Sequence, residues 1–177
     1  EGYITLGISG GMSTLICAML TASPEIVFML LESGANVTST DMMGNDAFML
    51  ASVSGRPQNL GCWLQKVKDW DLNRQNTVVG GCALGHAVYM GANKLETVKL
   101  LLNAGARLDD QSHTGANALM NAVENEDADS DVVRLVLDKF KSTFKGGMFT
   151  SFVNCQRHST TLKWKSIYFI AKSLYRT

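Results

Sequence analysis

The chain has 177 residues, of which 46% are hydrophobic and 18% are charged, a composition typical of a folded domain rather than a disordered segment. The longest apolar runs, such as residues 26–31, are too short to span a bilayer, and residues 1–20 lack the basic start and cleavage site of a signal peptide. The net charge is zero, but all 16 acidic residues lie within 1–138, whereas 139–177 holds 8 of the 16 Lys and Arg residues and no acid.

A repeated pattern runs through the chain, with glycine in its first position, a large apolar residue in its fifth and alanine in its eighth. The four copies start 33, 36 and 35 residues apart, and each predicts a short helix with small residues on one face. They are residues 11–18, 44–51, 80–87 and 115–122.

A second apolar stretch follows each copy and predicts a longer helix. In the third of these stretches, apolar residues at Leu95, Val98, Leu101 and Leu102 fall on one helix face. The four stretches are residues 24–37, 60–67, 95–108 and 131–138, of which 60–67 is the weakest.

Several residues indicate where these longer helices begin and end. Pro24 suits the first position of a helix, and Gly34 and Gly105 stand where a helix ends with a positive φ. The acidic residues 124–131 predict a solvated loop in which Ser130 or Asp131 caps the last helix.

The complete unit is a polar loop, a short helix, a turn, a longer helix and a Gly-Ala stop, and it resembles the ankyrin repeat. Residues 30–35 and 101–106 match the family's L-L-x-x-G-A ending, and Asp41 stands three residues before Gly44, as in the family. No copy has the complete T-P-L-H motif. The resemblance covers about residues 8–140.

The resemblance implies an all-α ankyrin-repeat solenoid of helix-turn-helix units joined by extended finger loops. The alternative is a general helical bundle in which the spacing is coincidental. Stacking favours the solenoid because a unit of two helices is too small to bury its apolar face alone. We therefore expect a repeat array over residues 1–140.

Residues 141–177 depart from the pattern and predict a basic C-terminal capping or linker region. Residues 161–175 read as a basic amphipathic helix, with Trp164, Ile167 and Leu174 on its apolar side. We expect this helix to close the end of the array. Contact with a membrane surface, or docking of a separate partner, is the alternative.

The sequence offers no catalytic residue, metal site or cofactor. Cys82 and His86 are spaced to share a helix face, but two ligands do not form a structural zinc site. Residues 7–14 lack the lysine of a phosphate-binding loop, and residues 124–131 lack the glycine and glutamate of a calcium loop. Cysteine chemistry favours an intracellular, cytoplasmic location, because four widely spaced residues do not suggest a disulfide framework: Cys17, Cys62, Cys82 and Cys155.

A partner-binding face follows from the resemblance, because ankyrin repeats bind partners with their finger loops and inner helices. Fingertips are normally polar, yet here several are apolar, and exposed apolar patches mark interaction sites. The predicted contacts are Met42, Met43, Asn45, Val53, Val78, Val79, Tyr89, Met90, His113 and Glu124. The alternative is that the loop of residues 69–80 folds back and covers Val78 and Val79.

The function that follows is a protein–protein interaction module, acting as a scaffold, an adaptor or an assembly subunit and binding another protein on its concave face. We expect no small-molecule substrate and, because residues 1–138 are acidic, no nucleic acid. The alternative is a regulatory ankyrin segment of a larger enzyme or channel, favoured by the absence of Met at position 1 and by the basic tail. A stand-alone enzyme would need a Cys–His pocket that nothing in the sequence suggests.

Overall fold

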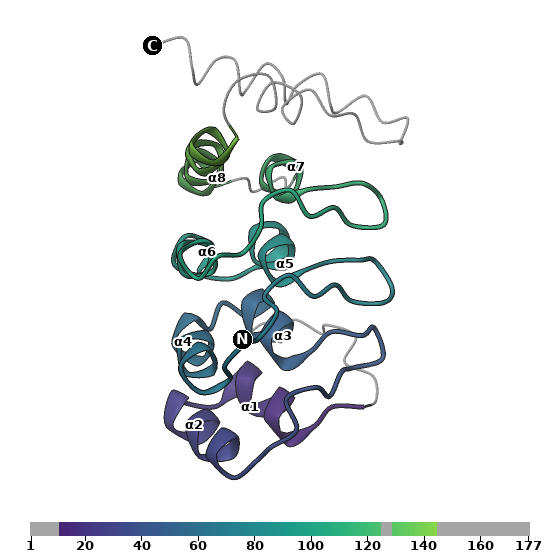
Figure 1. The fold of residues 1–177 in the computed structure, drawn as a ribbon, viewed down its shortest axis with the longest axis vertical. Helices are drawn as coiled ribbons and strands as arrows, with labels where there is room; N and C mark the ends of the chain where they lie inside the picture. The colour runs from purple at the N-terminus through teal and green to yellow at the C-terminus, as the bar shows by residue number, and fades with distance from the viewer. Residues whose placement is uncertain (1–10, 125–128, 145–177) are drawn as a thin grey trace, which may run out of the picture.

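The computed structural model describes residues 11–124 and 129–144, and this part of the chain forms a stack of four helix pairs (Figure 1). The predicted all-α array of helix-turn-helix units is confirmed. Its helices are α1 (Thr14–Thr21), α2 (Pro24–Glu32), α3 (Ala47–Val53), α4 (Pro57–Lys66), α5 (Ala83–Met90), α6 (Lys94–Asn103), α7 (Ala118–Glu124) and α8 (Ser130–Thr143).

The helices form two layers, which we call inner and outer. The inner helices α1, α3, α5 and α7 pack in that order, and the outer helices α2, α4, α6 and α8 stack beside them. Long loops before α3, α5 and α7 project from the inner side (Figure 1). The first helix of every repeat is therefore the one that meets the loops.

The repeated motif explains why each inner helix forms where it does. Its first residue, glycine, has a positive φ between 66° and 85° in all four copies, a conformation that other residues rarely adopt. The third residue caps the helix by accepting a hydrogen bond from the N–H three positions later. These caps are Ser13, Asp46, Cys82 and Asn117, with donor–acceptor distances of 3.3, 2.9, 3.4 and 2.9 Å.

A continuous apolar core fills the space between the two layers. The fifth motif residue of every copy, Leu or Phe, is buried, and the alanine in the eighth position is buried as well: Ala18, Ala51, Ala87 and Ala122. A methyl group at this position lets neighbouring inner helices pack closely. Among the described residues, the largest fully buried side chain is Trp63 of α4, which contacts Phe48 of α3 with ring centroids 6.0 Å apart.

The structure corrects two details of the outer helices. Helix α4 begins at Pro57, three residues before the predicted stretch 60–67. Proline suits the first position of a helix because the N–H of that position has no partner within the helix, so its absence costs nothing. Neither Ser130 nor Asp131 caps α8. The cap is Asp129, whose Oδ1 accepts from the N–H groups of the second and third residues after it at 2.8 and 3.3 Å.

Helix α8 continues to Thr143, past the expected array boundary at residue 140. The predicted amphipathic helix 161–175 and Cys155 lie outside the described residues. Among the helices of the described part, none has the length and apolar character that crossing a membrane requires.

Two glycines allow a test of the backbone argument, because a Cβ added at either meets no atom within 4 Å. Gly61 lies in the interior of α4 with an ordinary helical φ, whereas Gly34 has a φ of 78° after α2. We expect Gly61→Ala to raise the free energy of unfolding by about 0.5–1 kcal/mol. Gly34→Ala should lower it by about 1–2 kcal/mol because alanine is strained at positive φ.

Urea unfolding of the full-length chain, followed by circular dichroism, measures both changes against the wild type. If both alanines shift the midpoint in the same direction, backbone conformation is not what distinguishes the two sites.

Candidate protein-interaction surface

Three loops end in tight turns, which we call the fingertips and define as residues 41–45, 76–81 and 112–116. In each, the first residue's N–H donates to the last residue's carbonyl oxygen, at 2.9, 3.0 and 2.9 Å. The turn of the second fingertip is one residue longer than the turns of the other two. The extra residue lies in the segment that contains Val78 and Val79.

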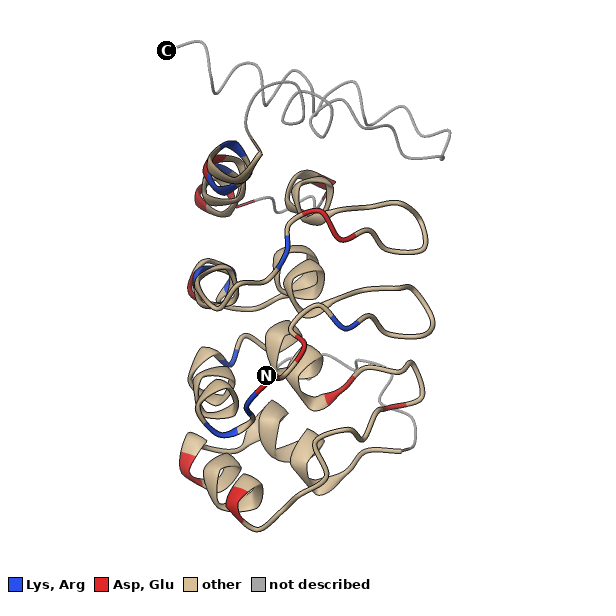
Figure 2. Ribbon diagram, in the orientation of Figure 1, with Lys and Arg blue, Asp and Glu red and all other residues tan. Residues whose placement is uncertain are grey.

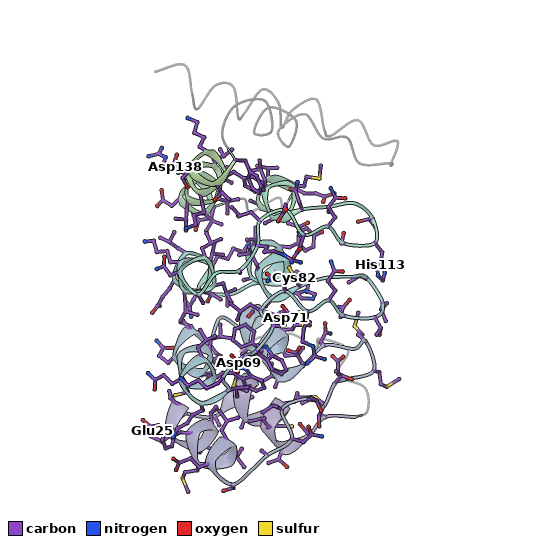
Figure 3. The ribbon with its side chains drawn as sticks, in the orientation of Figure 1. Glu25, Asp69, Asp71, Cys82, His113 and Asp138 are labelled. Atoms are coloured by element: carbon purple, nitrogen blue, oxygen red, sulfur yellow. The ribbon has the colours of Figure 1, made fainter. Side chains whose placement is uncertain are left out.

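Hydrogen bonds join the fingertips into a row. The backbone N–H of Thr77 donates to the carbonyl oxygen of Met43 at 3.2 Å, and the N–H of His113 donates to that of Val79 at 2.9 Å. The His113 ring adds a contact of 3.2 Å between Nδ1 and the carbonyl oxygen of Val78. Figure 3 shows His113 at the outer end of its loop. Successive fingertips are thus fixed to one another as well as to their own helices.

Apolar side chains project from this row. The exposed fractions are 68% for Met42, 40% for Met43, 55% for Val78 and 41% for Val79. The alternative in which residues 69–80 cover the two valines is therefore wrong.

The other predicted contact residues lie at the C-terminal ends of the inner helices and on the last fingertip. Tyr89 and Met90, at the end of α5, are exposed, and so is His113. Val53, at the end of α3, and Glu124, at the end of α7, are half-buried. An inner helix of eight residues separates a loop base from these ends by about 12 Å.

Asn45 is placed differently from the other predicted contacts, because its side chain is buried. Its amide donates to Asp41 Oδ2 at 3.0 Å, and its oxygen accepts from the amide of Asn76 at 2.7 Å. The side chain is used inside the protein to join two fingertips and is not presented to a partner.

Asn76 holds the second fingertip and was not identified from the sequence. Its Oδ1 accepts from the N–H of Val79 at 3.0 Å and from that of Gly81 at 3.2 Å, and only 2% of the residue is exposed. Asp41 does the same for the first fingertip, accepting from Met43 and Asn45. The sequence does place a polar residue at the start of each turn. In the second turn this residue stands one position farther from the motif glycine than in the other two, so counting back from the glycine does not find it.

His86 of α5 completes this polar network. Its Nε2 lies 3.4 Å from the amide nitrogen of Asn76, and because that nitrogen can only donate, Nε2 accepts. Burial lowers the pKa of His86, with the nearby charge of Asp41 acting in the opposite direction. The ring is therefore held in its neutral form.

The neighbouring Cys82 is a structural residue. Its Sγ accepts the hydrogen bond that caps α5, and burial raises the pKa of the thiol, so the reactive thiolate is disfavoured. Cys17, Cys62 and Cys82 are all free thiols. Within residues 11–124 and 129–144, no three His, Cys, Asp or Glu side chains gather in a way that could hold a metal ion.

Comparison with known proteins agrees with this geometry. Residues 48–145 match the family described as ankyrin repeats, in three copies. The chain belongs to the ankyrin-repeat family. The match covers the repeats that contain α3 to α8, and the pair α1 and α2 stacks on them in the same way.

A curated relative is the nuclear factor NF-kappa-B p105 subunit of Gallus gallus, which is 36% identical over 110 residues. The alignment covers 62% of this chain and 11% of the relative. In that protein the similar region is therefore a small part of a much longer chain. Ankyrin repeats are protein–protein interaction modules, and this is the general function of the array.

The lowered pKa of His86 predicts a pH dependence of stability. As the pH falls through about 6.5, His86 becomes protonated in the unfolded chain before it does so in the folded protein. The free energy of unfolding therefore decreases, by up to about 1.4 kcal/mol per pH unit. Between pH 7.5 and pH 5.5, we expect wild type to lose more stability than His86→Gln. Asp46, whose pKa is raised by burial, opposes this trend equally in both proteins.

The measurement is urea unfolding of both proteins at the two pH values. Equal losses in wild type and His86→Gln would contradict the assignment of a neutral, buried imidazole.

Proposed function

We propose that the array binds another protein with the face formed by its fingertips and the ends of its inner helices. The main support for this proposal is that exposed apolar side chains are concentrated on this face. Among the described residues, eight large hydrophobic side chains are exposed, and six of them lie on this face. These six are Met42, Met43, Val78, Val79, Tyr89 and Met90, with Val53, His113 and Glu124 beside them.

The fingertips are suited to binding because they are already ordered. Hydrogen bonds between successive tips and the buried network around Asn76 hold the backbone, so association does not have to order it. Methionine side chains adapt to the shape of a partner, and tyrosine is frequent among the residues that dominate binding energy. A fixed backbone that carries adaptable side chains supports recognition of a protein surface.

The charge of the fingertips indicates the chemistry of the partner. Asp41 is the one charged residue of the three fingertips, and its carboxylate accepts hydrogen bonds from the N–H groups of Met43 and Asn45. Figure 2 shows uncharged outer ends on the loops of the third and fourth repeats. A partner that places charged groups here would lose their hydration without gaining an ion pair. We therefore propose that the contacting segment of the partner is apolar and uncharged at its centre.

A second candidate is a regulatory ankyrin segment of a larger enzyme or channel. One observation favours it: in the p105 subunit, the region similar to this chain makes up 11% of the protein. The same face would then bind another part of its own polypeptide instead of a separate protein.

Met42 and Met29 provide a matched pair for testing the proposed face. Their exposed fractions are 68% and 64%, but Met42 lies on a fingertip and Met29 on the outer helix α2. We expect Met42→Glu to weaken binding at least about tenfold, since a charge would be buried in an apolar contact, an effect of about 1.4 kcal/mol or more. Met29→Glu should leave the dissociation constant unchanged.

The experiment captures partners of the wild-type chain from native lysate, identifies them by mass spectrometry and measures each purified partner by isothermal titration calorimetry. Circular dichroism verifies that both variants fold. Equal affinity of Met42→Glu and wild type for every partner would place binding elsewhere on the molecule, and loss with Met29→Glu alone would assign it to α2.

A further inference from the structure

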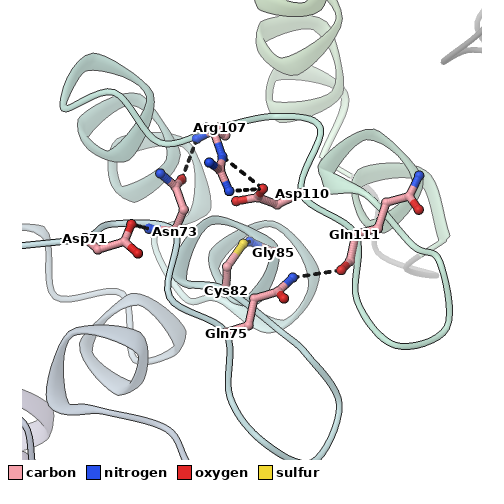
Figure 4. Close-up of polar contacts among 8 residues, drawn as sticks. All are labelled: Asp71, Asn73, Gln75, Cys82, Gly85, Arg107, Asp110 and Gln111. Carbon is pink, nitrogen blue, oxygen red and sulfur yellow. Dashed lines mark hydrogen bonds and ion pairs between the residues drawn. The ribbon is translucent and has the colours of Figure 1, made fainter.

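A small cavity lies between the third and fourth repeats, with a volume of ≈ 20 Å³. Residues of the loops before α5 and α7 and of the first turns of these two helices surround it, and part of this lining is visible in Figure 4. Gly85 contributes to the space because it has no side chain; a Cβ there would lie 3.3 Å from Asn121 Nδ2 and 3.7 Å from Cys82 Sγ. The lining includes Cys82, Gly85, Arg107, Asp110, Asn117 and Asn121.

Asn117 brings an unsatisfied donor to this cavity. The residue is 1% exposed, and its Oδ1 accepts the capping hydrogen bond from the N–H of Met120 at 2.9 Å. That bond fixes the orientation of the amide, because only the oxygen can accept. The remaining polar atom of the amide is therefore the donor Nδ2, which is buried without a hydrogen-bond partner in the described structure.

Asp110 brings an unsatisfied acceptor to the same cavity. Its Oδ1 accepts two hydrogen bonds from Arg107, at 3.0 Å from Nε and 2.6 Å from the terminal nitrogen (Figure 4). Its Oδ2 is buried and has no partner in the part of the chain described. A buried polar atom left unpaired costs about 1–3 kcal/mol, and both residues that carry these atoms line the cavity, so a molecule bound there would satisfy both.

The chemistry of the two atoms defines what that molecule is. It must accept a hydrogen bond from the Asn117 amide and donate one to the Asp110 carboxylate. A cation would face the amide protons, and an anion would face the carboxylate, whereas water both donates and accepts. The volume corresponds to a single water molecule, which needs about 10–15 Å³ of such space.

We propose that one water molecule is bound in this cavity and bridges Asp110 Oδ2 to Asn117 Nδ2. It joins the base of the last loop to the cap of α7, beside the direct bonds that hold the third repeat to this loop. Those bonds are Gln75 Nε2 to Gln111 O and Arg107 N to Asn73 Oδ1, each 2.8 Å long. The bridge therefore belongs to the junction that fixes the fourth repeat.

The corresponding cap in the second repeat has a different neighbour, although Oδ2 of that cap also lacks a hydrogen-bond partner in the described structure. Asp46 occupies the position of Asn117, and its Oδ2 lies 3.7 Å from the guanidinium of Arg74. A charged side chain lies beside the cap there, whereas at the fourth repeat the cap is an amide and the cavity that it lines is also lined by a carboxylate. A guanidinium can only donate, so a molecule between it and Asp46 would also have to donate to the carboxylate, whereas at the fourth repeat the bound molecule must accept from an amide and donate to a carboxylate.

Two measurements on the full-length chain test the proposal. A high-resolution crystal structure should show an electron-density peak at about 2.7–3.2 Å from both Asp110 Oδ2 and Asn117 Nδ2. In solution, the Asn117 amide protons should show a nuclear Overhauser effect to long-lived water. The matched control is Asn59, a buried amide whose nitrogen bonds to the carbonyl oxygens of Ala18, Met19 and Ala22.

A density peak bonded to both atoms, together with a water signal at Asn117 and none at Asn59, supports the bridge. A direct hydrogen bond between Asp110 and Asn117, a cavity without density, or identical behaviour of the two asparagines would overturn it.

Discussion

Close packing of the inner helices is the constraint on which the rest of the array depends. Alanine in the eighth motif position allows it, since Ala51 and Ala87 are fully buried in neighbouring helices and a larger side chain at either would strain the packing of α3 and α5. Loops that enter closely packed helices are themselves neighbours, which is why the backbone of one fingertip can bond to the next. The close spacing of the fingertips therefore depends on small residues in the core.

The four cap residues show how the fold persists in a sequence that departs from its consensus. Ser13, Asp46, Cys82 and Asn117 differ in charge, size and polarity, yet each accepts a hydrogen bond from the same backbone position. What the repeat requires at this place is an acceptor of the right reach and not a particular residue. The kind of acceptor still matters for the residues packed around the cap, since a carboxylate, a thiol and an amide need different neighbours.

Local patterns predicted the array, and what they missed has two causes, a long-range contact and a choice among neighbouring residues. Glycine, apolar and alanine positions placed all four inner helices, and the family position of Met42, Val78 and their neighbours anticipated the exposed row. The buried state of Asn45 could not be read in this way, because it depends on Asn76, which lies 31 residues away. The cap of α8 was missed by one residue because Asp129 stands in a run of several residues that can all cap a helix.

The additional residue in the second fingertip separates two properties that are usually coupled in a protein. The closing hydrogen bond between Asn76 and Gly81 and the bonds to both neighbouring tips persist despite the longer turn. The number of residues in this turn can therefore change without disturbing the stacking of the helices. Insertions and deletions here can alter the shape of the fingertip surface while the helices keep their arrangement. For protein engineering, this turn is a natural place for grafting foreign peptide segments; for evolution, it is a route by which one repeat can acquire a new shape in a single step.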